Sequence, residues 1–283
     1  MSKQEPTPNN FKTKAVAGVM KATQKVQDME LPIHLLIPNI ATIVALCLGL
    51  SAVRFALLGK FDMSLLALFG AAFFDALDGK LARLLKAETQ FGAQLDSLAD
   101  FANFGIAPTF VLYIFAFQKD QGMGWTICLF FAICQSLRLA RFNTQMHTKT
   151  RKLPANFFVG VPAPMGALVG LYPMILEFAL PVHFTTFVHI FFFGCAGCLM
   201  ISRIPTYSFK SVRVTRSMRL PILVLSILAI AALINATWIT LSVLIALYII
   251  SIVFSWLHFR TMRVKGKKQS KQKFSWPSFL SKN

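Results

Sequence analysis

A succession of apolar runs dominates this sequence and limits the folds that it can adopt. A helix needs roughly 17–25 residues to cross a bilayer, and apolar runs of about that length lie near residues 38–58, 63–85, 95–117, 124–142, 160–180, 185–201, 219–235 and 236–257. Hydrophobic residues make up 55% of the chain, above the roughly 45–50% of a soluble domain. We therefore expect an all-α, polytopic membrane bundle of about eight transmembrane helices. Only a tight turn near residues 235–238 separates the last two runs, so a single re-entrant pair is an alternative.

The apolar runs divide the chain into three parts. Residues 1–37 are expected to be a cytoplasmic N-terminal segment, whose apolar residues at loosely helical spacing predict an amphipathic helix on the membrane surface. Residues 38–258 form the predicted transmembrane domain, and residues 259–283 form a basic cytoplasmic tail. No cleavable signal peptide is expected, because the first apolar run begins late and lacks a cleavage pattern.

Basic residues outnumber acidic ones by 29 to 11, but they do not gather on one soluble face. They cluster in short loops and tails around the apolar runs, which is typical of membrane topology signals and does not predict nucleic-acid binding. If both termini lie in the cytoplasm, the only basic residues predicted on the opposite side of the membrane are Arg54, Lys60 and Lys119. The basic tail is expected to attract anionic membrane lipids.

Four aspartates interrupt the apolar pattern around the predicted cytoplasmic loop between the second and third runs. At about 100° per residue, each of two helices would carry two of these aspartates on one face. The first face holds Asp75, Asp78, Gly79 and Ala82, with Arg83 at its edge, and the second holds Gly92, Asp96, Asp100 and Asn103. Helices joined by a short connection are usually neighbours, so we expect the two faces to converge.

Convergent carboxylates inside a membrane need a counter-charge, because each charged aspartate at the bilayer centre costs roughly 2.5–3.5 kcal/mol on insertion scales. Nearby Lys80, Arg83 and Lys86 could supply part of it. With no His or Cys nearby, the all-oxygen set suits Mg²⁺, Mn²⁺ or Ca²⁺. Bare backbone at Gly79 and Ala82 would then let a phosphate-bearing ligand approach closely.

The aspartates have two alternative interpretations. Taken singly, each could be a helix cap or a member of an interfacial ion pair, but the joint spacing is too strict for that. A transporter could use carboxylates as a cation path, but it would be expected to place them near mid-membrane, on broken helices. Here the carboxylates cluster toward one predicted side, which favours an enzyme.

The spacing DxxDGxxAR, followed after eight residues by GxxxDxxxD, resembles the signature of the CDP-alcohol phosphatidyltransferase family. Every element of the signature is present between Asp75 and Asp100. Further stretches resemble the bacterial, integral-membrane members of the family that use L-serine as the acceptor. These are "IPNIAT" from Ile37, "DSLADFANFGIAP" from Asp96, "RLARFN" from Arg138 and "FFVGVPAP" from Phe157.

The resemblance implies an enzyme that joins an alcohol to the phosphatidyl group of CDP-diacylglycerol and releases CMP. It implies that Asp75, Asp78 and Asp96 hold a pair of divalent ions, Mg²⁺ or Mn²⁺, and that Asp100 is a shared ligand or the general base. The implied donor-binding residues are Asn39, Thr42, Gly79, Ala82, Arg83 and Gly92. It also implies a homodimer in the bacterial cytoplasmic (inner) membrane, with the active site facing the cytoplasm.

Two arginines on the fourth run are candidates for binding the acceptor. Arg138 and Arg141 are three residues apart and therefore share a helix face. Guanidinium groups match carboxylates and phosphates, so the pair could hold the serine carboxylate or a phosphate; interfacial anchoring of the helix is the alternative. Choline, glycerol 3-phosphate and inositol remain alternative acceptors, although choline would prefer an aromatic cage.

Overall fold

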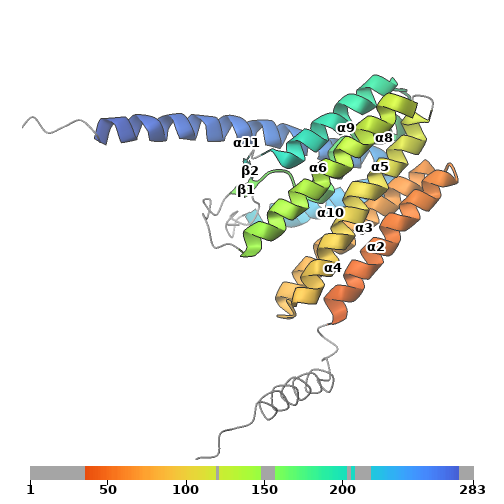
Figure 1. Cartoon of the computed structure of the whole chain (residues 1–283), viewed down its shortest axis with the longest axis horizontal. Coiled ribbons are helices and arrows are strands. Elements are labelled where there is room, and N and C mark those ends of the chain that lie inside the picture. Colours follow the sequence, from red (N-terminus) through yellow and green to blue (C-terminus); the bar gives the residue numbers. More distant parts are fainter. Residues whose placement is uncertain (1–35, 119–120, 148–156, 203–204, 208–217, 274–283) are drawn as a thin grey trace, which may run out of the picture.

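The computed structural model describes residues 36–118, 121–147, 157–202, 205–207 and 218–273, and the fold they form is a bundle of helices (Figure 1). The predicted helix of the N-terminal segment and the end of the basic tail lie outside the described residues. The first half of the bundle contains α2 (Leu36–Leu57), α3 (Phe61–Leu84), α4 (Gln90–Phe101), the π-helical segment η2 (Ala102–Ile106), α5 (Ala107–Leu112), the π-helical segment η3 (Tyr113–Phe117) and α6 (Gln121–His147).

The second half of the described chain adds more helices and two short strands. They are β1 (Phe157–Val159), α7 (Ala163–Gly170), α8 (Tyr172–Ala179), α9 (Thr186–Ile201), β2 (Pro205–Tyr207), α10 (Arg219–Asn235) and α11 (Thr237–Lys273). The strands pair antiparallel, with Phe158 opposite Thr206. They bring the segment before α7 beside the segment after α9, an arrangement that the apolar pattern did not predict.

The helix α2 packs closely against α3 and α4 because its inner face consists of small residues. Buried alanines and Gly49 recur along that face at helical spacing. The amide of Asn103, from η2, lies in the space that a side chain at Gly49 would need. From α3, the hydroxyl of Ser64 donates to the carbonyl of Ala52 over 2.8 Å.

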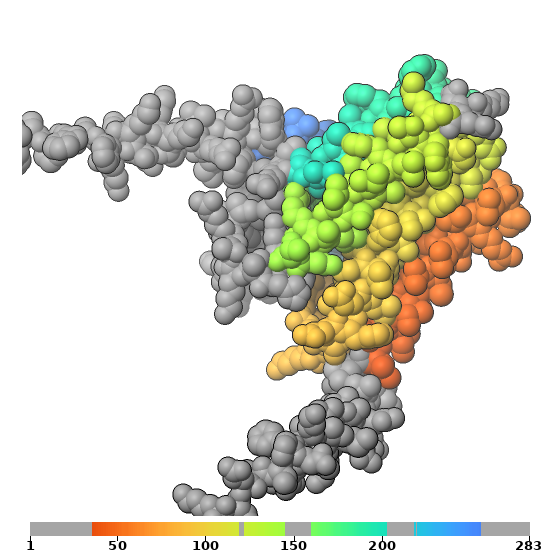
Figure 2. Space-filling view, in the orientation of Figure 1, coloured from red at the N-terminus to blue at the C-terminus, as the bar shows by residue number. Residues whose placement is uncertain are grey.

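The core continues between α6, α7 and α9, where aromatic rings replace the small residues. The rings of Phe131 and Phe193 stack with centroids 4.0 Å apart. Gly170, at the end of α7, leaves room for the Phe193 ring. On the outer surface, α2, α4, α6 and α9 lie side by side (Figure 2), and many large apolar side chains there are exposed, as expected for lipid contact.

The prediction of a helical membrane protein is confirmed, whereas the count of about eight spans is not. Within the described residues, four helical stretches are long and apolar enough to cross a membrane: Leu36–Leu57, Gln90–Phe117, Gly122–Thr144 and Thr237–Ser255. Thr186–Ile201 and Leu220–Asn235 are shorter apolar helices. The 24 residues of α3 have sufficient length but carry several charges.

The predicted span 160–180 is not one continuous helix. It is divided into α7 and α8, of eight residues each, which meet around Leu171. Pro173 lies in the first turn of α8, where its missing N–H removes no helical hydrogen bond. The last two predicted runs form two separate helices, with Ala236 alone between α10 and α11.

At the end of the bundle away from the α3–α4 connection, the half-buried carboxylate of Glu177 links the end of α8 to the start of α9. Glu177 accepts a hydrogen bond from the backbone N–H of Phe184 over 3.0 Å. Its carboxylate oxygens also lie 3.0 Å from Nε2 of His189 and 3.3 Å from Nδ1 of His183. These contacts fix the start of α9 against the end of α8.

Candidate active site

The site forms where α3 ends and α4 begins, at the same end of the bundle as the start of α2 (Figure 1). The connection after α3 is short and turns at Lys86, whose φ is +53°. Thr89 then caps α4, because its hydroxyl accepts a hydrogen bond from the backbone N–H of Gly92 over 3.0 Å. The sharp reversal places the last turns of α3 beside the first turns of α4.

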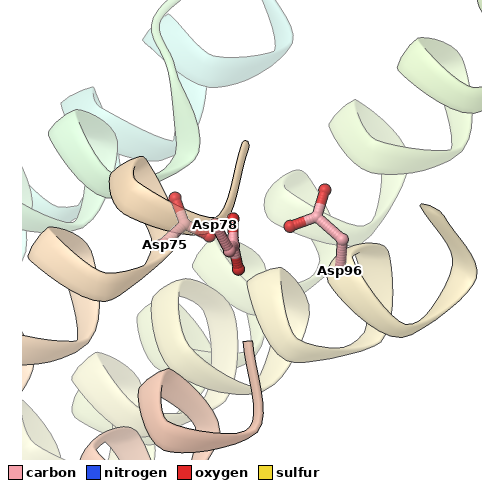
Figure 3. A group of neighbouring side chains, drawn as sticks. All are labelled: Asp75, Asp78 and Asp96. Carbon is pink, nitrogen blue, oxygen red and sulfur yellow. The ribbon is translucent and has the colours of Figure 1, made fainter. Parts of the chain in front are cut away.

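Three of the predicted aspartates come together across this reversal. Asp75 and Asp78 lie on α3, and Asp96 faces them from α4 (Figure 3). One carboxylate oxygen from each of the three lies within 4.8 Å of the other two. The convergence that helical spacing predicted is therefore present in the fold.

Asp100 lies one turn beyond Asp96 and makes a different contact. Its carboxyl group is within hydrogen-bonding reach of the Asp75 carboxyl. Its Oδ1 atom is buried and has no hydrogen-bond partner among the described residues. Asp100 is thus adjacent to the group of three without belonging to it.

The residues present fit a divalent cation. Oδ2 of Asp78 and Oδ1 of Asp100 are buried carboxylate oxygens without hydrogen-bond partners in the described part of the chain. No Lys or Arg there forms an ion pair with the four aspartates, and the guanidinium of Arg83 turns back to donate to the carbonyl of Gly79 over 2.8 Å. Hard carboxylate oxygens are the ligands that Mg²⁺ and Mn²⁺ prefer.

The start of α2 forms another wall of the site. The hydroxyl of Thr42 is buried and donates to the carbonyl of Pro38 over 3.1 Å, and its side chain also meets that of Asp78. The Asn39 amide occupies the space beside Gly92, since a Cβ at Gly92 would lie 2.9 Å from Asn39 Oδ1. The structure therefore brings Thr42 to Asp78 and Asn39 to Gly92 at the start of α4.

Gly79 is open toward the solvent side of the site, and helix packing does not require a glycine there. A Cβ at this position would meet only Nη2 of Arg83, at 3.9 Å. Ala82, one turn later on the same face, is partly exposed. The two small residues leave uncovered backbone beside the carboxylates.

The two predicted arginines have different surroundings. Arg138 donates from Nε to the carbonyl of Val161 over 2.8 Å, and its guanidinium interacts electrostatically with Asp75 and Asp100. Arg141 instead donates from Nη1 to the carbonyl of Ile201, at the end of α9, over 2.8 Å. The structure thus places Arg138 at the aspartates and engages Arg141 with the end of another helix.

Sequence reasoning missed one polar residue beside Arg138. Tyr248 of α11 has a buried hydroxyl with no hydrogen-bond partner among the described residues, and it interacts electrostatically with Arg138. No spacing could have indicated it, because Tyr248 stands alone in an apolar run far along the chain.

Fold and site together define a helical membrane protein with a carboxylate cluster near one end of the bundle, and this cluster is compatible with a divalent cation. The model of the CDP-alcohol phosphatidyltransferase family matches residues 35–196, which include every residue of the site except Tyr248. A second family model, CDP-alcohol phosphatidyltransferase 2, matches residues 217–252. The chain belongs to the CDP-alcohol phosphatidyltransferase family.

Several curated relatives carry the name CDP-diacylglycerol–serine O-phosphatidyltransferase. The protein of that name from Mycobacterium tuberculosis is 34% identical over 223 residues, which cover 78% of each chain. The Mycobacterium leprae protein is 35% identical over 225 residues, covering 78% of this chain and 74% of the relative. The Helicobacter pylori protein is 29% identical over 239 residues, covering 83% and 97% respectively.

Proposed function

We propose that this protein transfers the phosphatidyl group of CDP-diacylglycerol to the hydroxyl of L-serine, giving phosphatidylserine and CMP. The observation that carries the proposal is the convergence of Asp75, Asp78 and Asp96, with Asp100 beside them. Family membership supports the reaction type. The names of the relatives and the cationic Arg138 at the site support serine as the acceptor.

In the proposed reaction, the serine hydroxyl oxygen forms a bond to the β-phosphorus of the donor while the bond from that phosphorus to CMP breaks. The hydroxyl proton passes to a carboxylate, and CMP leaves as the anion. Asp100 suits the role of base, because its buried Oδ1 is an unused acceptor next to the group of three. A carboxylate within hydrogen-bonding reach of the attacking hydroxyl can take up its proton during the reaction.

The group of three would hold one or two divalent ions. Such ions, when bound, neutralise the pyrophosphate and stabilise the departing CMP. The chain's own contribution is to keep the three carboxylates together across the short α3–α4 connection. The open backbone at Gly79 and Ala82, with Asn39 and Thr42 on the facing helix, would receive the cytidine diphosphate part of the donor.

Three further features belong to the same proposal. Basic residues between the apolar runs favour a cytoplasmic site and cytoplasmic termini in a bacterial inner membrane. The donor's acyl chains would lie in the surrounding lipid, where the exposed apolar helix faces are. A homodimer is proposed from the family resemblance.

The test is CMP release by the purified full-length protein with CDP-diacylglycerol as donor. We expect release only when L-serine and Mg²⁺ or Mn²⁺ are both present, and its loss on chelation. Choline, glycerol 3-phosphate and inositol, each offered at the same concentration, serve as the matched acceptors. CMP release that is fastest with one of these three would contradict the serine assignment while keeping the reaction type.

A further inference from the structure

Three polar atoms from three different helices are buried near one another without hydrogen-bond partners in the described part of the chain. They are Oδ1 of Asp100 on the α4 helix, Nη1 of Arg138 on α6 and the hydroxyl of Tyr248 on α11. Arg138 interacts electrostatically with both Asp100 and Tyr248, so the three side chains belong to one buried polar group. Buried polar atoms are nearly always paired in folded proteins, so such a group points to a missing ligand.

The chemistry of these atoms specifies the kind of ligand. The Asp100 carboxylate can only accept a hydrogen bond, Arg138 Nη1 can only donate one, and the Tyr248 hydroxyl can do either. A molecule with a hydroxyl at one end and an anionic group at the other would satisfy all three. Its hydroxyl would donate to Asp100, and its anionic group would accept from Arg138 and Tyr248.

The Nε atom of Arg138 also forms a hydrogen bond, and this bond limits how the guanidinium can move. Nε is held by the carbonyl of Val161 over 2.8 Å. This bond anchors one edge of the planar guanidinium, while Nη1 stays buried without a hydrogen-bond partner among the described residues. Arg141 lacks this arrangement, since its Nη1 is engaged by Ile201.

We infer that Tyr248 is an acceptor-binding residue, whose hydroxyl joins Arg138 in holding the carboxylate of the acceptor alcohol. The inference rests on the proposed function and deepens it, because it explains how an α-helix outside the signature selects an acceptor with an anionic group. An alcohol without such a group would leave Arg138 Nη1 and the Tyr248 hydroxyl unpaired, which is costly inside a protein.

The experiment compares Tyr248→Phe with the wild-type protein and with Tyr113→Phe as a matched control. Tyr113 lies in η3, at the far end of the continuous helical stretch Gln90–Phe117, and packs against Trp125. Because a hydrogen bond to a charged group contributes roughly 1.5–3 kcal/mol, we expect Tyr248→Phe to raise KM for L-serine about 10- to 100-fold. The kcat, and KM for CDP-diacylglycerol, should change less than about threefold, and Tyr113→Phe should match the wild type.

Two competitive inhibitors distinguish carboxylate binding from a general structural effect. L-alanine has the carboxylate and ammonium group of serine but no hydroxyl, whereas ethanolamine has the hydroxyl and ammonium group but no carboxylate. Tyr248→Phe should weaken inhibition by L-alanine by the same factor as KM for serine and leave inhibition by ethanolamine unchanged. A merely structural role would weaken both inhibitors alike, and that result would overturn the inference.

The failure of the inference is separable from failure of the proposed function. Wild-type CMP release with serine tests the function alone. If serine is used but its KM is unchanged in Tyr248→Phe, the function stands and the inference is wrong. If the wild type prefers glycerol 3-phosphate, the serine assignment fails, and a raised KM for that anionic acceptor in Tyr248→Phe would still support anion binding by Tyr248. Preference for choline would overturn both.

Discussion

At the scale of single residues, the four aspartates are not equivalent. Asp75, Asp78 and Asp96 share one small volume, whereas Asp100 sits one turn further along α4 and faces Arg138 as well as Asp75. A carboxylate at the centre of the group is suited to a cation, and one at its edge is suited to the incoming hydroxyl. The two roles respond differently to the same substitution.

We predict that Asp100→Asn keeps most metal and donor binding but loses turnover by about 10²- to 10⁴-fold, the range typical of removing a general acid or base. The amide preserves the shape of the side chain and one oxygen, but it is not a base. Steady-state CMP release and equilibrium binding of CDP-diacylglycerol measure the two effects separately.

Asp62→Asn is the control for Asp100→Asn, because Asp62 is exposed in the first turn of α3, away from the site. It should behave like the wild type. If raised Mg²⁺ or Mn²⁺ alone restores much of the Asp100→Asn turnover, Asp100 is mainly a metal ligand and the base role is wrong.

Gly79→Leu is predicted to abolish donor binding without unfolding the protein. A side chain there would fill the open surface beside the carboxylates but meet no packed neighbour. Ala82→Leu should act in the same direction and less completely. Binding of CDP-diacylglycerol and thermal unfolding in detergent are the measurements, with Gly122→Leu as control because Gly122 also has open space around it.

Retained CDP-diacylglycerol affinity in Gly79→Leu would mean that Gly79 does not border the donor. A lowered unfolding temperature with lost binding would instead indicate a structural role that the open surroundings of Gly79 do not predict.

At the scale of elements, the sequence predicts those parts that depend on local geometry. Helical periodicity places Asp75 with Asp78 and Asp96 with Asp100, and the short connection forces α3 and α4 to be neighbours. The convergence of the carboxylates follows from these two facts alone. Neither requires knowledge of distant segments.

Other elements could not be predicted because tertiary packing decides them. A hydropathy run does not show that the helix breaks at Leu171, between α7 and α8. Beside this break, Gly170 packs against Phe193 of the later helix α9, and such a contact leaves no signal in the run itself. Periodicity places Arg138 and Arg141 on one face, but their separate carbonyl partners come from later segments. The pairing of β1 with β2 and the approach of Tyr248 are non-local in the same sense.

The contact between α2 and η2 gives a prediction at this scale. In Gly49→Ala, the new Cβ would lie 2.9 Å from Cγ of Asn103. Overpacking of this kind typically costs about 1–3 kcal/mol, so we expect a lower unfolding temperature in detergent. Turnover should fall as well, because Asn103 follows Asp100 on the same helical run.

Gly122→Ala provides the comparison for Gly49→Ala, since a Cβ at Gly122 meets nothing within 4 Å. It should leave the unfolding temperature unchanged or raise it slightly, because alanine favours a helix over glycine. Equal unfolding temperatures for the two variants would show that Asn103 moves aside at little cost.

At the scale of the whole molecule, labelling the two loops that flank α3 tests how the protein is oriented in the membrane. With the native cysteines replaced, Lys86→Cys should react with a membrane-impermeant maleimide only after cells are permeabilised. Lys60→Cys should react in intact cells. The reason is the distribution of basic residues between the two sides. The reverse pattern would place the carboxylates outside the cell.

The position of the carboxylates near one end of the bundle also concerns the membrane around the protein. Under the proposed function, the acyl chains of donor and product remain anchored in the monolayer nearer Asp75 and Asp96 throughout the reaction. Each turnover therefore changes the headgroup composition of that monolayer alone. Charge asymmetry across the bilayer would arise directly from the architecture of the enzyme, and equalising it would require a separate step that carries headgroups through the hydrocarbon.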